Sequence, residues 1–270
     1  MVHLYRESNP YRHDFHIKNV FFDNDDVLYK APDNQDDYHK LAAIRAVQQE
    51  FPDMGNRQLA RLMELGREEG KGSLDIFVER FNIDADFLRE NHYKQLIKLT
   101  KEFPQFFEDE ESPYGDLGKL RIAGINAHII THGNPEWTEY TMSKGERSIA
   151  AFFSQEAGSY TCKDHMDDFS GKTKGDIYEF ALDKIGTPAL RKGRGEGCAM
   201  VEDTMKNLRA AKDLGMMTVF INRKDVDLSK IADYVDVVVS RCNDAIQTVM
   251  QSNAQHEVQS RFDCDGLSCD

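Results

Sequence analysis

The chain has 270 residues, of which 40% are hydrophobic, enough for an ordinary globular core and too many for a wholly disordered chain. Its 47 acidic residues outnumber 34 basic ones and give a formal net charge of −13, which argues against binding nucleic-acid polymers through a broad basic face. No apolar run is long enough to span a bilayer, the first residues show no secretory signal pattern, and the five cysteines are scattered. We therefore expect a cytoplasmic protein that does not bind membranes.

The first third of the chain predicts one strand followed by a long helical block. Residues 1–15 are polar and aperiodic, which is typical of an N-terminal arm. The apolar segment 16–22 predicts a strand that ends in an acidic cluster at 23–26. Apolar residues at helical spacing then predict only helices from about 36 to 104.

After residue 113 short apolar strands alternate with helical patterns. The expected strands are 127–131, 159–162, 199–202, 217–221 and 235–239, and helices are expected near 135–143, 176–185 and 205–214. This alternation predicts βα units, and thus a parallel sheet covered by helices on both faces.

The sequence therefore predicts an α/β protein with an inserted domain. We expect a Rossmann-like, three-layer αβα core from residues 16–30 and 113–250, an all-helical insertion at 31–112, and a polar C-terminal tail at 251–270. The insertion is inferred because the first strand precedes the helical block and the remaining strands follow it.

Reactive side chains follow the expected strands. In an open parallel sheet, ligands bind beyond the carboxyl ends of the strands. The candidates at this edge are Asp23 and Asp25, Thr131, Lys172 or Lys174, and Glu202 with Asp203. Taken singly, each is more often a turn, a helix cap or a solvated charge. Their common position at one edge favours a site.

The acidic pair suggests metal-assisted chemistry. Asp23 and Asp25 are two residues apart, so both can face the same side, and carboxylates this close raise each other's pKa unless a cation lies between them. A divalent cation such as Mg²⁺, completed by Asp203, would remove that repulsion. One carboxylate could then attack phosphorus while the other protonates the leaving alcohol, and a hydroxyl and a lysine could stabilise the phosphoryl oxygens.

Four segments in the same order resemble the motifs of the haloacid dehalogenase superfamily, which consists mostly of phosphatases. Residues 21–29 resemble its first motif, an apolar strand followed by Asp-x-Asp. Residues 129–134 resemble the second motif, with Thr131 after the strand, and 172–179 resemble the lysine motif that opens a helix. Residues 200–208 resemble the fourth motif, and the likeness extends from about 17 to 222 without the helical block.

This resemblance implies a phosphatase with an aspartyl-phosphate intermediate. Asp23 would be the nucleophile, Asp25 the acid/base, and Mg²⁺ would be bound by Asp23, the backbone carbonyl of Asp25 and Asp203. The other implied roles are phosphate binding by Thr131 and His132, charge neutralisation by Lys172, and support of these groups by Glu202 and Asn207. The helical insertion would be a mobile cap that closes the site and contributes specificity.

Some positions depart from the superfamily pattern. Asp26 replaces the usual Gly or Asn and adds negative charge where phosphate must arrive. His132 stands where Asn is usual. An alignment without gaps gives Lys172 as the motif lysine, whereas a compact loop would offer Lys174. The Asp-x-Asp-x-x-Leu-Tyr start and the Glu-Asp-x-x-x-Asn-Leu segment are most similar to pyrimidine 5′-nucleotidase-like members.

Three alternatives remain open on sequence grounds. Dehalogenation needs one attacking carboxylate but neither a second one nor a metal, so Asp25 and Asp203 favour phosphoryl transfer. A phosphomutase would use the same groups, and a catalytically weak phospho-ligand-binding protein would retain the fold. Nucleotide monophosphates, sugar phosphates and phosphoglycolate all fit as small phosphomonoester substrates, and the sequence specifies no oligomeric state.

Overall fold

The computed structural model describes most of the chain, which divides into two compact units. The described residues are 16–71, 74–103, 107, 112–144, 147–153, 159–161, 171–186 and 193–265. The first unit, called here the α/β unit, comprises Met1–Tyr29, Glu110–Pro135 and Thr141–Asp270, and the second, the helical unit, comprises Lys30–Asp109 and Glu136–Tyr140. The arm expected at 1–15 lies outside the described residues.

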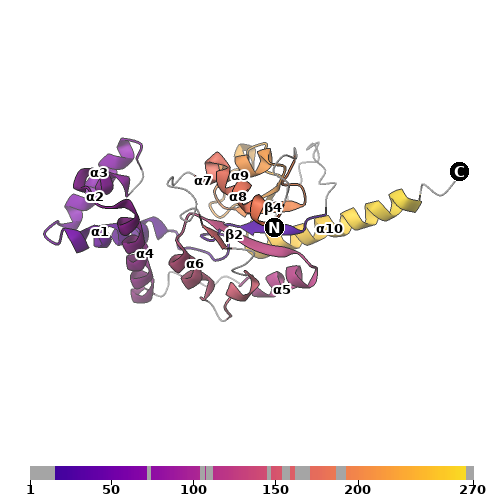
Figure 1. Cartoon of the computed structure of the whole chain (residues 1–270), viewed down its shortest axis with the longest axis horizontal. Coiled ribbons are helices and arrows are strands. Elements are labelled where there is room, and N and C mark those ends of the chain that lie inside the picture. The colour runs from indigo at the N-terminus through magenta and orange to yellow at the C-terminus, as the bar shows by residue number, and fades with distance from the viewer. Residues whose placement is uncertain are drawn as a thin grey trace. The chain divides into compact units, whose positions relative to one another are not determined.

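A parallel sheet forms the centre of the α/β unit (Figure 1). Its strands are β1 (Asn19–Phe22), β2 (Asn126–Thr131), β3 (Ser159–Thr161), β4 (Cys198–Glu202), β5 (Met217–Ile221) and β6 (Val237–Val239). They lie in the order β3-β2-β1-β4-β5-β6, and every neighbouring pair is parallel. The predicted α/β fold with a parallel sheet is thereby confirmed.

Strands β1, β2, β4, β5 and β6 contribute side chains to two separate cores because successive residues point to opposite faces. In β1, Val20 and Phe22 belong to one core, whereas Phe21 belongs to the other. All residues of β4 and β5 are buried, as expected for central strands covered on both faces.

Helices cover both faces of this sheet. They are α5 (Tyr114–Ile122), α7 (Gly171–Lys174), α8 (Asp176–Lys184), α9 (Met205–Asp213) and α10 (Cys242–Asp265), with short 3-10 turns at Ala150–Phe152 and Leu228–Lys230. Most of α6 (Pro135–Met142) belongs to the helical unit. Apolar residues of α5 and α10 pack in the core that contains Val20, and those of α8 and α9 pack in the core that contains Phe21 (Figure 1).

The C-terminal segment that was expected as a polar tail contains the end of a long helix. Helix α10 continues through Asp265, so residues 251–265 are helical, and only 266–270 lie outside the described residues. Within this part of the helix, the side chain of Asn253 forms two hydrogen bonds with the backbone of Ile17. Its Oδ1 accepts from the backbone N–H of Ile17 at 2.7 Å, and its Nδ2 donates to the Ile17 carbonyl at 2.8 Å. The first strand begins at Asn19 rather than at residue 16.

The helical unit has its own small core. Its helices are α1 (Gln35–Glu50), α2 (Asn56–Glu68), α3 (Asp75–Phe81) and α4 (Ala85–Glu102). Helix α4 begins after Asp84, whose side chain accepts from the backbone N–H of Phe87 at 2.8 Å, a standard N-cap. Helices α2 and α3 approach so closely that a Cβ on Gly66 would lie 2.8 Å from Cβ of Ile76.

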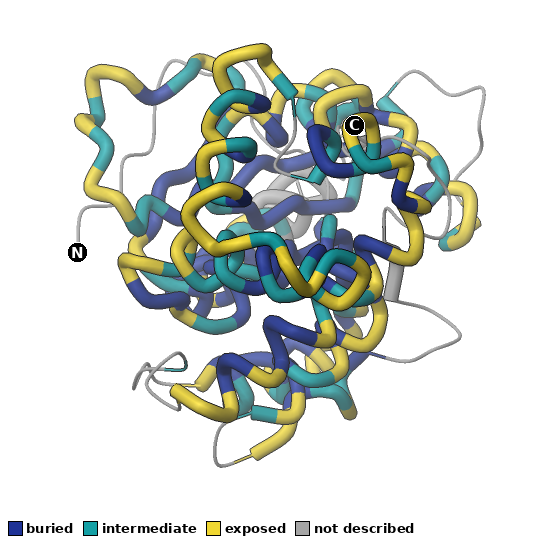
Figure 2. Tube along the Cα trace, turned by 90° about the vertical axis from the view of Figure 1, so that its left-hand side faces the viewer, coloured by how far each residue is buried: buried dark blue, intermediate teal, exposed yellow. Residues whose placement is uncertain are grey.

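Burial along the trace follows the helical period (Figure 2). Turns of the helices alternate between buried and exposed residues, as expected when each helix packs on one side only. None of the helices in the described part of the chain combines the length and the apolar character that crossing a bilayer requires.

Candidate active site

The strand order of the sheet reverses at β1 and β4. On one side of this point the strands follow the chain outward from β1 to β2 and β3. On the other side they follow it outward from β4 to β5 and β6. In such a sheet the carboxyl ends at the reversal form the natural place for a ligand. Phe22 lies opposite Val201 in the register, and the backbone N–H of Asp23 donates to the Val201 carbonyl at 2.9 Å. The residues that follow these two strands are therefore neighbours.

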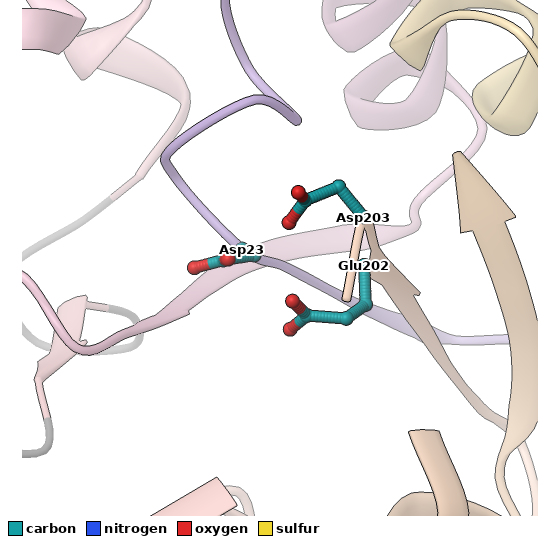
Figure 3. Close-up of side chains that lie close together, drawn as sticks. All are labelled: Asp23, Glu202 and Asp203. Carbon is teal, nitrogen blue, oxygen red and sulfur yellow. The ribbon is translucent and has the colours of Figure 1, made fainter. Parts of the chain in front are cut away.

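Three carboxylates meet at this point (Figure 3). One oxygen from each of Asp23, Glu202 and Asp203 lies within 4.8 Å of the others. Asp23 follows β1, whereas Glu202 ends β4 and Asp203 comes directly after it. Glu202 is fully buried and Asp23 is nearly so. The geometry suits a hard divalent cation, which prefers oxygen ligands.

A buried lysine contacts two of these carboxylates. Lys172, in the single turn α7, has no exposed surface, and its Nζ lies 2.6 Å from Oδ1 of Asp23 and 2.9 Å from Oε2 of Glu202. Burial alone would lower the pKa of Lys172, but the carboxylates of Asp23 and Glu202 outweigh it and raise the pKa well above its usual value. Lys174, the alternative from sequence, is exposed.

Both oxygens of Glu202 already accept hydrogen bonds. Lys172 donates to Oε2, while Nδ2 of Asn207 and the backbone N–H of Thr204 each donate to Oε1 at 3.2 Å. The hydroxyl of Tyr178 in turn donates to the Asn207 carbonyl at 3.0 Å. Glu202 is therefore suited to orienting Lys172, which leaves Asp23 and Asp203 as the better metal ligands.

Negative charge exceeds positive charge in the cluster. Burial, and then the carboxylates of Asp23 and Asp26, raise the pKa of Asp203 to about 7. A carboxylate whose pKa is raised by like charges gains most from a cation placed between it and its neighbours. Asp203 therefore fits the role of a ligand to Mg²⁺.

The end of β2 presents hydrogen-bonding groups next to this cluster. Thr131 is buried, and its Oγ1 accepts from the backbone N–H of Gly133 at 3.0 Å. Burial, and then the positive charge of Lys172, lower the pKa of His132 to about 4. Its imidazole is therefore neutral near pH 7 and can donate one hydrogen bond without adding charge.

Asp25 is held by its own chain segment. The hydroxyl of Tyr29 and, at 3.2 Å, Nδ2 of Asn24 both donate to Oδ1 of Asp25. Asn24 and Tyr29, which contact Asp25, were not among the site residues predicted from sequence. The signal that could have indicated Asn24 is a polar residue between two acidic ones directly after an apolar strand.

Asp26 adopts a backbone conformation that favours glycine. Its φ is 58°, and its carbonyl accepts from Nε of Arg223 at 3.0 Å. Its charge helps to raise the pKa of Asp203, so the added negative charge expected from sequence acts on the carboxylate cluster.

A comparison with protein families identifies the family of this chain. A family model of haloacid dehalogenase-like hydrolases matches residues 17–215. A search of curated protein sequences finds no match.

Solved structures with similar folds include CbbY from Rhodobacter sphaeroides in complex with phosphate. It is 17% identical, with a TM-score of 0.55, and the match covers 84% of this chain and 95% of that one. A variant of CbbY with xylulose-(1,5)bisphosphate is 15% identical, with a TM-score of 0.54 and the same coverage. A hydrolase from Pseudomonas syringae is 16% identical, with a TM-score of 0.53 and coverage of 87% and 98%. At these identities the likeness shows the fold.

Proposed function

Because the chain belongs to the haloacid dehalogenase-like hydrolase family, we propose that it is a Mg²⁺-dependent phosphatase that hydrolyses a small phosphomonoester through an aspartyl-phosphate on Asp23. The observation that carries this proposal is the contact of Lys172 with Asp23 beside the carboxylate of Asp203. A nucleophile, a neutralising cation and a metal-binding carboxylate at one sheet edge are the groups that phosphoryl transfer needs.

The proposed reaction has two halves. In the first, an oxygen of Asp23 attacks phosphorus, the bond to the ester oxygen breaks, and Asp25 gives its proton to that oxygen so that an alcohol leaves. In the second, Asp25 takes a proton from water, the water oxygen attacks phosphorus, the acyl-phosphate bond breaks, and inorganic phosphate leaves. Both carboxyl groups then return to their starting states.

The remaining groups stabilise the negative charge on the phosphoryl oxygens. Lys172, Thr131 and His132 are the proposed donors to these oxygens, and Glu202 and Asn207 support Lys172. Mg²⁺, when bound, supplies further positive charge there. The groups that would hold it are the carboxylates of Asp23 and Asp203 and the backbone carbonyl of Asp25.

Two alternative reactions, dehalogenation and phosphoryl transfer to a second hydroxyl, would use these side chains differently. Dehalogenation would use Asp23 alone to attack carbon and would leave both Asp25 and the Asp203 carboxylate without a task. A phosphomutase would share the first half-reaction and differ in passing the phosphoryl group to a second hydroxyl rather than to water.

For the substrate, we propose sugar phosphates and nucleoside monophosphates as the first classes to test. The xylulose-(1,5)bisphosphate bound to CbbY suggests the former, and the nucleotidase-like first and fourth motifs suggest the latter. We also propose that the helical unit acts as the cap that selects among them. The cytoplasm remains the proposed compartment, on the scattered cysteines of the sequence.

Release of phosphate from p-nitrophenyl phosphate with Mg²⁺ tests the reaction class. We expect Asp23→Asn to abolish turnover while circular dichroism shows a retained fold, since the amide cannot form the acyl phosphate. The matched control is Asp227→Asn, the same change at an exposed residue of the α/β unit, which should keep wild-type activity. Acid-quenched wild-type enzyme should carry one phosphoryl group on the peptide that contains Asp23. Turnover by Asp23→Asn equal to that of the control would refute the proposal.

A further inference from the structure

The carboxyl group of Asp25 is oriented by two donors that come from the same short segment. The hydroxyl of Tyr29, four residues later, and Nδ2 of Asn24, one residue earlier, both donate to Oδ1. Two donors on one carboxyl oxygen fix both the side-chain rotamer and the plane of the group. Hydrogen bonds to a carboxylate are also stronger than those between neutral groups.

Asn24 is itself fixed in position. It has no exposed surface, and its Oδ1 accepts from the hydroxyl of Thr141 at 3.1 Å. Because Thr141 donates to the amide oxygen, the amide nitrogen is directed toward Asp25. The backbone N–H of Asn24 donates to Oδ1 of Asp23 at 2.8 Å, so one buried residue touches both proposed reacting carboxyl groups.

The hydroxyl of Tyr29 donates a hydrogen bond to the carboxyl group of Asp25. A phenol ordinarily loses its proton only at about pH 10, so the Tyr29 hydroxyl is available as a donor to Asp25 at neutral pH. A tyrosine present only for packing could be replaced by phenylalanine at no cost to Asp25, whereas this hydroxyl directs its hydrogen bond to that carboxyl group.

We propose that Tyr29 and Asn24 are positioning residues for the acid/base step, and that they hold Asp25 where it can protonate the departing oxygen. This inference rests on the proposed phosphatase function. The roles differ in strength, because Tyr29 offers a hydroxyl to Asp25 directly, while Asn24 divides its amide between Asp25 and Thr141.

The inference predicts a dependence on the leaving group that a structural role would not produce. A p-nitrophenolate anion leaves without a proton, whereas an alkoxide needs one as its bond to phosphorus breaks. Loss of orientation at Asp25 should therefore slow alkyl esters much more than p-nitrophenyl phosphate. The parameter kcat/KM is the informative one, because it covers the steps only up to departure of the alcohol.

The experiment compares Tyr29→Phe with wild type on p-nitrophenyl phosphate and on an alkyl monoester, glycerol 3-phosphate. We expect kcat/KM for the alkyl ester to fall about tenfold and that for p-nitrophenyl phosphate to fall less than about twofold, a part of the 10²–10⁴-fold that general acid catalysis supplies. The apolar variant Asn24→Leu should shift the same ratio in the same direction. Its combination with Tyr29→Phe should cost less than the product of the two, since both act on one carboxyl group.

Thr248→Val is the matched control for lost stability. It removes a buried hydroxyl of the α/β unit, which donates to the Asp244 carbonyl at 2.8 Å. This change should leave the ratio of the kcat/KM values for the two esters as it is in wild type. A Tyr29→Phe enzyme that slows both esters equally, or neither, would overturn the positioning role while leaving the phosphatase proposal intact. A wild-type enzyme without phosphate release from any monoester, and without phosphorylated Asp23, would overturn both.

Discussion

Replacing Lys172 with methionine would test how the carboxylate cluster is held together. The unbranched side chain has a similar length and suits a site with no exposed surface. The substitution removes the ammonium that lies 2.6 Å from Asp23 and 2.9 Å from Glu202. Both carboxylates then stay buried, beside that of Asp203, without their lysine partner.

The expected cost in metal-free buffer is about 3–5 kcal/mol of unfolding free energy, the usual effect of removing one partner from a buried ion pair. Adding Glu202→Gln to the variant returns the cluster to its original net charge and keeps an acceptor for the Asn207 amide. We expect this second change to recover about half of the loss, since one of two uncompensated carboxylates is gone. Mg²⁺ should stabilise Lys172→Met more than wild type, because the cation takes the place of the ammonium.

The assay is urea-dependent labelling of the thiol of Cys198, read by mass spectrometry of its peptide. This thiol is buried in β4, and burial raises its pKa to about 12, so it reacts only when the sheet opens. The reasoning is refuted if Lys172→Met is within about 1 kcal/mol of wild type, or if Glu202→Gln brings no recovery.

Three further outcomes follow from buried contacts. Burial, and then the neighbouring His39, lower the pKa of His92 in the folded protein from 6.5 to about 3. Between these two pH values only the unfolded chain takes up the proton, which favours unfolding. The helical unit should lose about 2 kcal/mol between pH 7.5 and 5; fluorescence of the single tryptophan in urea should show this, and His92→Gln should remove it. Gly66→Ala should destabilise the same unit by about 1–3 kcal/mol in spite of alanine's better helix propensity, because the new Cβ meets that of Ile76; a higher melting temperature would contradict this. Asn253→Ala should cost about 2–3 kcal/mol in urea, since the N–H and C=O of Ile17 both lose their buried partner, whereas a neutral result would mean that water replaces the amide.

The parallel sheet was predictable because its strands are apolar and short and are separated by helical patterns. Met217–Ile221 has the same bounds in the sequence prediction and in the structure, since every residue of that segment is apolar or β-branched and buried. The continuation of α10 beyond residue 250 was missed for the opposite reason. Its polar sequence gave no periodic signal, and its partner Ile17 lies 236 residues away from Asn253.

At the site, strand ends predicted which carboxylates could meet, but not what each side chain contacts. Asp23 and Asp203 follow neighbouring parallel strands, so their proximity follows from topology. The pairing of Lys172 with Glu202 depends on the rotamers of two buried side chains, which spacing does not encode. The hydrogen bond from Tyr29 to Asp25 depends on the turn after β1, where the N–H of Leu28 returns to the Asn24 carbonyl at 3.0 Å.

The central place of β1 has a consequence for biosynthesis. This strand leaves the ribosome first of the six, yet its two neighbours, β2 and β4, begin at Asn126 and Cys198. The helices between Gln35 and Glu102 contact one another, chiefly α1 with α4, and all four are synthesised before β2, so they can form before β1 has a partner strand. A nascent or truncated chain that stops before Glu202 therefore carries Asp23 without a complete β4 and without the other two carboxylates of the cluster. Such fragments should lack the proposed phosphatase activity.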